Sequence, residues 1–132
     1  MKALVVEDDS ASRMLMQELL KPYGEIHIAA NGAEALFAYK TSLDTKAPYD
    51  LVCLDIMMPG IDGKQVLRKI RETEDKLNIF PGDGVKIFMT SALGDKENVF
   101  DAYRDQCDAY LVKPISKQKL LEHLKAFGLI KG

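Results

Sequence analysis

The chain has 132 residues, of which 47% are hydrophobic and 29% charged, so it can bury one core of ordinary domain size and is not a disordered segment. Its 18 basic and 20 acidic residues leave a formal net charge of −2 without a basic stripe, which argues against direct binding of nucleic acid. No apolar run is long enough for a signal-peptide core or a membrane span, and Cys53 and Cys107 lack metal-ligand spacing. We therefore expect one domain over residues 1–132, in a reducing cytoplasmic compartment, with no membrane partner.

Short apolar runs alternate with segments of helical periodicity five times along the chain. The runs that we expect to be strands are residues 3–6, 25–29, 51–54, 85–89 and 109–112. The segments that we expect to be helices are residues 10–20, about 31–41, one that begins at the cap Asp62, about 95–105, and one that begins at the cap Ser116. Pro22 and Gly24 end the first of these helices, and Asn31 with Glu34 has the pattern of a capping box.

Apolar strands that alternate with helices indicate a parallel sheet with helices on both faces. Residues 25–29 alternate polar and apolar side chains, which is typical of an edge strand with one face in water. Right-handed crossovers and this edge then favour the strand order 2-1-3-4-5. The predicted fold class is therefore α/β, a doubly wound five-stranded parallel sheet in three α/β/α layers, as in flavodoxin.

Polar residues follow four of the five predicted strands. Glu7 and Asp8 follow the first strand, Asp55 follows the third, Thr90 the fourth and Lys113 the fifth. Because parallel strands end at the same edge of a sheet, these side chains should converge where open α/β sheets bind ligands. Any one of them alone is more simply an ordinary loop residue, but chance convergence at four strand ends is a poor explanation.

The residue types at this edge suit the transfer of a phosphoryl group. Three carboxylates repel one another unless a cation lies among them, and Mg²⁺ prefers such hard oxygen ligands. Asp55 would be the nucleophile that forms an acyl phosphate, and Lys113 would supply a positive charge. Thr90 could donate a hydrogen bond to a phosphoryl oxygen. The sequence thus predicts a Mg²⁺-assisted phosphoryl transfer onto an aspartate.

At these residues the chain resembles the receiver domain of two-component response regulators, the CheY-like domains, over nearly its whole length. The matching stretches are Leu4 to Asp9 (LVVEDD), Asp50 to Gly63 (DLVCLDIMMPGIDG), Met89 to Ala92 (MTSA) and Ala109 to Pro114 (AYLVKP).

The resemblance implies a role for each matching residue. It implies that Glu7 and Asp8 bind Mg²⁺ together with Asp55, the phosphorylated residue, and with the backbone carbonyl of Met57. It also implies that Thr90 and Lys113 contact the phosphoryl group and that the Lys113–Pro114 bond is cis. Tyr110 matches the family's switch aromatic, whose ring turns inward as the threonine moves, although an aromatic residue is also ordinary in a strand.

The function that we predict is that of a stand-alone response regulator, because Met1 directly precedes the first strand and no effector domain follows the last helix. A sensor histidine kinase or a phosphotransfer protein would donate the phosphoryl group. The protein would act as a phosphoacceptor that catalyses only its own phosphorylation and slow dephosphorylation. The resemblance implies that a downstream target binds the face formed by the fourth helix, the fifth strand and the fifth helix.

Three features depart from the family's usual pattern. Residues 77–84 and, to a lesser degree, 41–49 are long connections at the end of the sheet opposite the predicted site, and tolerated surface insertions are the simpler explanation. Gln106 stands where many receivers have glycine. Met57 and Ala92 cannot position a hydrolytic water with their side chains, so we expect the phosphorylated form to be long-lived.

Three other classes of protein would use the same fold or the same aspartate differently. A flavin carrier of the same fold would need a phosphate-binding loop after the first strand, where Glu7 and Asp8 would repel phosphate. An aspartyl phosphatase would need a second aspartate at position 57, which is Met57. A docking module that works without phosphorylation remains the main alternative, against which the complete set of site residues argues.

Overall fold

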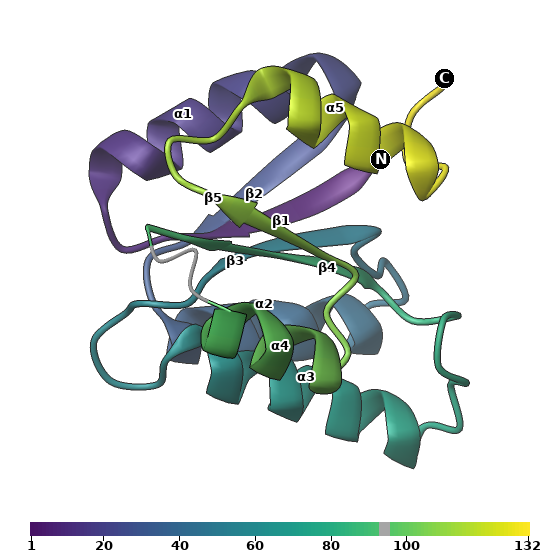
Figure 1. The fold of residues 1–132 in the computed structure, drawn as a ribbon. Coiled ribbons are helices and arrows are strands. Elements are labelled where there is room, and N and C mark those ends of the chain that lie inside the picture. The colour runs from purple at the N-terminus through teal and green to yellow at the C-terminus, as the bar shows by residue number, and fades with distance from the viewer. Residues whose placement is uncertain (93–95) are drawn as a thin grey trace.

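The computed structural model describes residues 1–92 and 96–132, and it contains one five-stranded parallel sheet. The strand order is β2-β1-β3-β4-β5, so the predicted order and the predicted edge position of β2 are both confirmed (Figure 1). The strands are β1 (Lys2–Val6), β2 (Glu25–Ala29), β3 (Leu51–Asp55), β4 (Lys86–Ser91) and β5 (Ala109–Val112). The chain passes from β1 to the edge strand β2 and then back across β1 to β3, so the strand order reverses between the neighbours β1 and β3.

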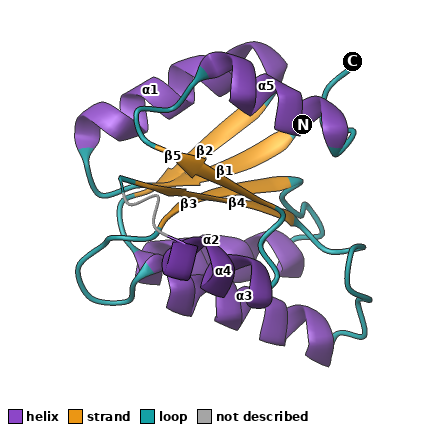
Figure 2. Ribbon diagram, in the orientation of Figure 1, coloured by secondary structure: helices purple, strands orange, loops and turns teal. Residues whose placement is uncertain are grey.

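Helices cover both faces of the sheet, as the apolar strands predict. They are α1 (Ser10–Leu20), the short 3₁₀ helix η1 (Lys21–Tyr23), α2 (Gly32–Asp44), α3 (Gly63–Lys76), α4 (Lys96–Arg104) and α5 (Lys117–Ala126). Figure 2 shows α1 and α5 on one face and α2, α3 and α4 on the other. The predicted start of the fourth helix near Asp95 falls outside the described residues. Within the described part of the chain, no helix has the length and apolar character needed to cross a bilayer.

The two faces of the sheet bury separate apolar cores, because successive residues of a strand point to opposite sides. In β1, Ala3 and Val5 pack toward α1 and α5, whereas Leu4 and Val6 pack toward α2 and α3. All five residues of β3 are buried. Full burial of one such aliphatic side chain contributes about 1.5–3 kcal/mol, so these layers hold the strand ends firmly in register. Cys53 lies within the core, as expected of a free cysteine in an apolar strand.

Side-chain caps begin four of the helices and set the turns that lead out of the sheet. Asp9 accepts a hydrogen bond from the Ser12 amide at 2.9 Å, and Asp62 forms a full capping box with Gln65. Asn31 and Ser116 cap α2 and α5 in the same way. In α2 the predicted box differs in detail, since Glu34 accepts from the Ala30 amide one residue before the cap. Each cap fixes where a helix starts relative to the strand before it.

Several predicted boundaries differ by a residue or more, and the largest differences are at the ends of β4 and α2. Strand β4 runs to Ser91, so Thr90 lies inside the strand and pairs with Asp55 instead of following the strand end. Helix α2 continues to Asp44, because Leu43 packs against the core and adds one more turn of apolar contact. The connection before β3 is therefore shorter than the sequence suggested.

Candidate functional site

The carboxylates of Glu7, Asp8 and Asp55 meet at the carboxyl edge of the sheet. One oxygen from each lies within 4.8 Å of the others. Glu7 and Asp8 belong to the turn between β1 and α1, and Asp55 is the last residue of β3. Because β1 and β3 are hydrogen-bonded neighbours, with Val6 opposite Leu54, the next residue of each strand reaches the same place. The convergence predicted from the strand ends is thus present for these three residues.

Glu7 is held by hydrogen bonds from both its main chain and its side chain. Its amide donates to the Ala29 carbonyl at 3.1 Å, which extends the β1–β2 ladder by one residue. Its Oε1 accepts from the Asp9 amide at 3.2 Å, and its Oε2 accepts from Lys113 Nζ at 2.7 Å. Its carbonyl accepts from Arg13 Nη1 at 3.0 Å. Glu7 is therefore a fixed, buried part of the site.

Lys113 lies between two of the carboxylates. Its Nζ is 2.7 Å from Glu7 Oε2 and 3.4 Å from Asp55 Oδ2. The lysine follows β5, and its amide donates to the Ser91 carbonyl at the end of β4. The Lys113–Pro114 bond is cis, as expected. Lys113 thus brings a positive charge from the far side of the site, where the sequence predicted it.

Burial and charge shift two pKa values at this site. Burial raises the pKa of Glu7 to about 7; the hydrogen bond from Lys113 opposes this and the neighbouring Asp55 adds to it. Burial alone would lower the pKa of Lys113, but its hydrogen bond with Glu7 and the charges of Asp55 and Glu7 outweigh burial and raise it. The buried Glu7 carboxylate is therefore easier to protonate than a free one, and the Lys113 ammonium is harder to deprotonate.

Asp55 and Thr90 are buried neighbours across the sheet. They are paired in the β3–β4 register, and the Ile56 amide donates to the Thr90 carbonyl at 3.0 Å. Asp55 Oδ1 accepts a long hydrogen bond of 3.4 Å from the Met57 amide. The fractional exposures of Asp55 and Thr90 are only 4% and 3%. Their side chains are therefore placed by strand pairing, which is more rigid than a loop.

The donor set fits a divalent cation with a preference for oxygen. Glu7, Asp8 and Asp55 offer three carboxylates against the one ammonium of Lys113. Asp8 is exposed, so the cluster is open to solvent on that side. Mg²⁺ takes oxygen ligands and retains several waters, which suits a site that is partly open. The chemistry of these residues therefore agrees with the predicted magnesium site.

A hollow of about 440 Å³ lies beside this cluster. Glu7, Thr90 and Lys113 form part of its wall, and Leu15 of α1 and Pro114 form part of the rest. Leu15 and the adjacent Met14 have exposed fractions of 43% and 65%, which is high for apolar side chains. A partner that binds α1 here would lie next to the buried carboxylates.

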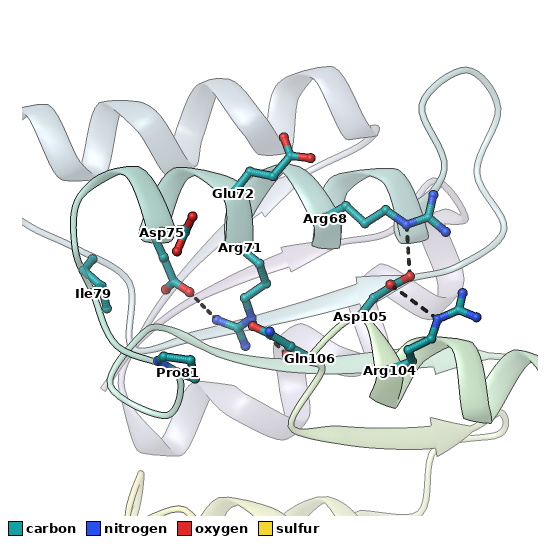
Figure 3. A pocket seen from close by; sticks show the side chains of 10 residues that line it. Arg68, Arg71, Glu72, Asp75, Ile79, Pro81, Arg104, Asp105 and Gln106 are labelled. Carbon is teal, nitrogen blue, oxygen red and sulfur yellow. Dashed lines mark hydrogen bonds and ion pairs between the residues drawn. The ribbon is translucent and has the colours of Figure 1, made fainter.

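A second hollow, of about 300 Å³, lies at the opposite end of the sheet, on the same side as the connection from α3 to β4 (Figure 3). Arg71 in its wall donates to Glu74 Oε1 at 2.7 Å and to Asp108 Oδ2 at 2.9 Å. Arg68 pairs with Asp105 at 3.0 Å. The charged groups of this hollow are thus largely satisfied by one another, and we assign it a structural role.

The sequence did not single out Arg13, although it contacts the backbone of the site. Arg13 lies four residues after the cap Asp9, a spacing that returns a helical side chain toward the turn before it. Tyr110 is half-buried and packs against the core on the α2 and α3 side of the sheet, and the Met57 side chain is 60% exposed. Their predicted roles as switch residue and carbonyl ligand stay predictions.

The model of the response regulator receiver domain matches residues 3–125. The doubly wound five-stranded sheet agrees with this match, because CheY-like solved structures have the same fold. The chain belongs to the response regulator receiver domain family. The family is a signalling module of two-component systems, and the resemblance found in the sequence is confirmed.

The chain is similar to parts of longer curated proteins. The chain is 35% identical over 126 residues to the transcriptional regulatory protein ResD of Bacillus subtilis, covering 95% of this chain and 47% of that protein. It is 34% identical over 128 residues to the hybrid signal transduction histidine kinase L of Dictyostelium discoideum, covering 96% of this chain and 7% of that protein. The chain thus spans half or less of the length of these relatives.

Solved structures agree with the fold in detail. A complex from Borrelia burgdorferi that contains CheX, CheY, BeF₃ and Mg²⁺ superposes with a TM-score of 0.81 at 27% identity. The match covers 98% of this chain and 90% of that chain. This chain is therefore similar over its whole length to a receiver whose structure was solved with magnesium.

Proposed function

We propose that this chain accepts a phosphoryl group on Asp55 in a Mg²⁺-dependent reaction and signals by the conformational change that follows. The observation that carries the proposal is the meeting of three carboxylates with Lys113 at one sheet edge. The buried and paired position of Asp55 supports its role as the acceptor, since it is held by β3 on the side of the site that faces Lys113.

The residues of the site divide the tasks of the proposed reaction among them. An Asp55 carboxylate oxygen attacks phosphorus, the bond from phosphorus to the donor's imidazole nitrogen breaks, and the imidazole leaves and takes up a proton. Glu7, Asp8, Asp55 and the Met57 carbonyl would bind Mg²⁺, which neutralises charge on the transferring group. Lys113 would exchange part of its contact with Glu7 for a phosphoryl oxygen. Thr90 would donate its hydroxyl to another.

The conformational response would involve Thr90 and Tyr110. A threonine that moves toward the new phosphoryl group leaves space that the half-buried Tyr110 ring could fill. Phosphorylation would then shift a two-state equilibrium that exists before it. The apolar hollow beside Leu15 supports docking of a phosphodonor, either a sensor histidine kinase or a phosphotransfer protein. The exposed side chains of Phe100, Tyr103 and Val112 on α4 and β5 support docking of a downstream target.

The proposal is tested by the intact mass of the protein after incubation with acetyl phosphate. We expect one phosphoryl adduct on the wild type with MgCl₂, and none with EDTA or on Asp55→Asn. Asp62→Asn is the matched control, because Asp62 is a half-buried helix cap outside the cluster, and this variant should be phosphorylated normally. An adduct that forms equally on Asp55→Asn would overturn the role of Asp55. A folded, Mg²⁺-binding wild type without any adduct from acetyl phosphate or a histidine phosphodonor would favour the docking module.

A further inference from the structure

The Asp8 side chain is held differently from those of Glu7 and Asp55, the other two carboxylates of the cluster. Among the described residues, none forms a hydrogen bond with its side chain, and it is exposed. Glu7, by contrast, is buried and bonded through its carboxylate. The direction of the Asp8 side chain is therefore set by the peptide group that joins Glu7 to Asp8 and by the turn that follows.

Arg13 holds that peptide group. Its Nη1 donates to the Glu7 carbonyl at 3.0 Å, across six positions of the chain. Arg13 lies in the first part of α1 and Glu7 lies directly after β1, so this bond spans the turn between them. Asp9 also stabilises this turn. Its side chain caps α1 at the Ser12 amide, and its own amide donates to Glu7 Oε1. Two side chains thus restrict the rotation of the peptide that aims Asp8.

The positive charge of Arg13 would oppose the binding of a cation at this site. A guanidinium close to a site for a divalent cation repels that cation, so simple electrostatics would favour a neutral residue there. An arginine that also orients the ligand backbone can still increase affinity, because preorganised ligands lose less conformational freedom on binding. The two effects have opposite signs on the dissociation constant for Mg²⁺, so an experiment can separate them.

We propose that Arg13 is a positioning residue for Mg²⁺, which holds the Glu7–Asp8 peptide so that the Asp8 carboxylate faces Glu7 and Asp55. This inference rests on the proposed magnesium site and adds a residue to it that does not touch the metal. It predicts that removal of the Arg13 side chain weakens Mg²⁺ binding although it removes a repelling charge.

The test is isothermal titration of the metal-free protein with MgCl₂, on wild type, Arg13→Met and Arg13→Lys. Arg13→Met should raise the dissociation constant about three- to tenfold, the usual effect of losing one partly exposed hydrogen bond. Arg13→Lys keeps the charge and a donor, so it should stay within about twofold of wild type. Lys21→Met is the matched control, because it removes one exposed charge at the far end of α1 and should change little.

A second measurement separates positioning from general destabilisation. Urea unfolding of Arg13→Met in EDTA should stay close to wild type, because the side chain is only partly buried. Amide hydrogen exchange at Asp8 and Asp9 should speed up in the same variant while exchange in β3 stays unchanged. A loss of affinity accompanied by faster exchange throughout the sheet would overturn the positioning role.

The outcomes also separate this inference from the proposed function. If wild type binds Mg²⁺ and Arg13→Met binds it equally or more tightly, the guanidinium acts only as a charge and the positioning role is wrong. If wild type itself binds no Mg²⁺, the proposed site fails and the inference fails with it.

Discussion

Lys113 Nζ and Glu7 Oε2 lie 2.7 Å apart although 106 positions separate the two residues in the chain. The contact joins the end of β5 to the end of β1 across the carboxyl edge of the sheet, and Asp55 of β3 lies 3.4 Å from the same Lys113 Nζ. We propose that Glu7 binds Mg²⁺ and that Lys113 contacts the phosphoryl group, so each partner of this contact also has a second proposed partner. In the proposed reaction Lys113 gives up part of this contact to a phosphoryl oxygen, so the contact would link metal binding to phosphorylation.

Lys113→Met should separate these two roles. Loss of the internal cation leaves the carboxylates freer for a metal, so Mg²⁺ should bind several-fold more tightly. Transfer from acetyl phosphate should slow by about tenfold or more, because the charge that faces the phosphoryl oxygens is gone. Calorimetry gives the affinity and intact mass gives the rate. Lys117→Met, an exposed lysine four residues away, should change neither. An unchanged rate would contradict the role of Lys113.

The pKa of Glu7 predicts how the stability of the metal-free protein depends on pH. Burial raises this pKa from 4.5 to about 7, so between these values the folded state binds more protons than the unfolded state. The free energy of unfolding should therefore fall as pH rises from about 5 to 7, by roughly 1.4 kcal/mol for each unit of difference in pKa. The measurement is urea unfolding in EDTA at several pH values.

Glu7→Gln is the control for this pH dependence, since it removes the titrating group and keeps the shape. Among the described residues, the other resolved shifts belong to groups that titrate well outside this window: Asp9 at acidic pH, and tyrosines, cysteines and Lys113 at alkaline pH. The slope between pH 5 and 7 should thus be reduced in the variant. The same slope in wild type and Glu7→Gln would show that another group causes it.

Arg71 should matter for stability and not for phosphorylation. It pairs with Glu74 of α3 and with Asp108 directly before β5, and it lines the second hollow (Figure 3), whereas the acidic cluster lies at the carboxyl ends of β1 and β3. Arg71→Met would leave the buried Glu74 and the half-buried Asp108 without their cationic partner, although each still accepts a backbone amide, and loss of one partner of a buried ion pair typically costs about 3–5 kcal/mol. Arg68→Met removes a more exposed ion pair of the same helix and should cost less than about 1 kcal/mol. Urea unfolding measures the free energy of unfolding of both variants. Equal losses in the two would contradict the structural role of Arg71.

Gln106→Gly should stabilise the protein. Gln106 has a φ of 75°, a left-handed conformation that costs a residue with a side chain about 1–2 kcal/mol. Glycine adopts it freely, and its greater freedom in the unfolded chain offsets part of the gain, so we expect a gain on the order of 0.5–1 kcal/mol in the free energy of unfolding. Gln106→Ala is the control, since alanine keeps the strain and should give no gain. A loss of stability in the glycine variant would contradict this explanation.

The fold could be predicted because its signals are local and agree with one another. The apolar run before Asp55, the alternation in residues 25–29 and the cap at Asp62 each occur within a few residues. The position of Gln106 was also informative, since the turn keeps the left-handed conformation that glycine favours. The end of α2 was predicted too early, because it depends on the contact of Leu43 with the core, which is a tertiary contact.

The candidate site could be predicted only in part. The sequence placed Glu7, Asp55 and Lys113 at one edge, since strand ends in a parallel sheet share that edge. Arg13 was missed because an arginine on a helix has many uses, and its bond with the Glu7 carbonyl depends on the path of the turn. The direct contact of Lys113 with Glu7 was also missed, since strand order gives proximity and not pairing.

The most direct test of the account is chemical mapping of the phosphorylated residue. The wild type is incubated with acetyl phosphate and MgCl₂, the acyl phosphate is reduced with sodium borohydride, and peptides are sequenced by mass spectrometry. Hydride reduction releases phosphate and converts a phosphorylated aspartate to homoserine. We predict homoserine at position 55 alone, and none when EDTA replaces MgCl₂. Homoserine at another aspartate, or its formation at position 55 without Mg²⁺, would contradict the account.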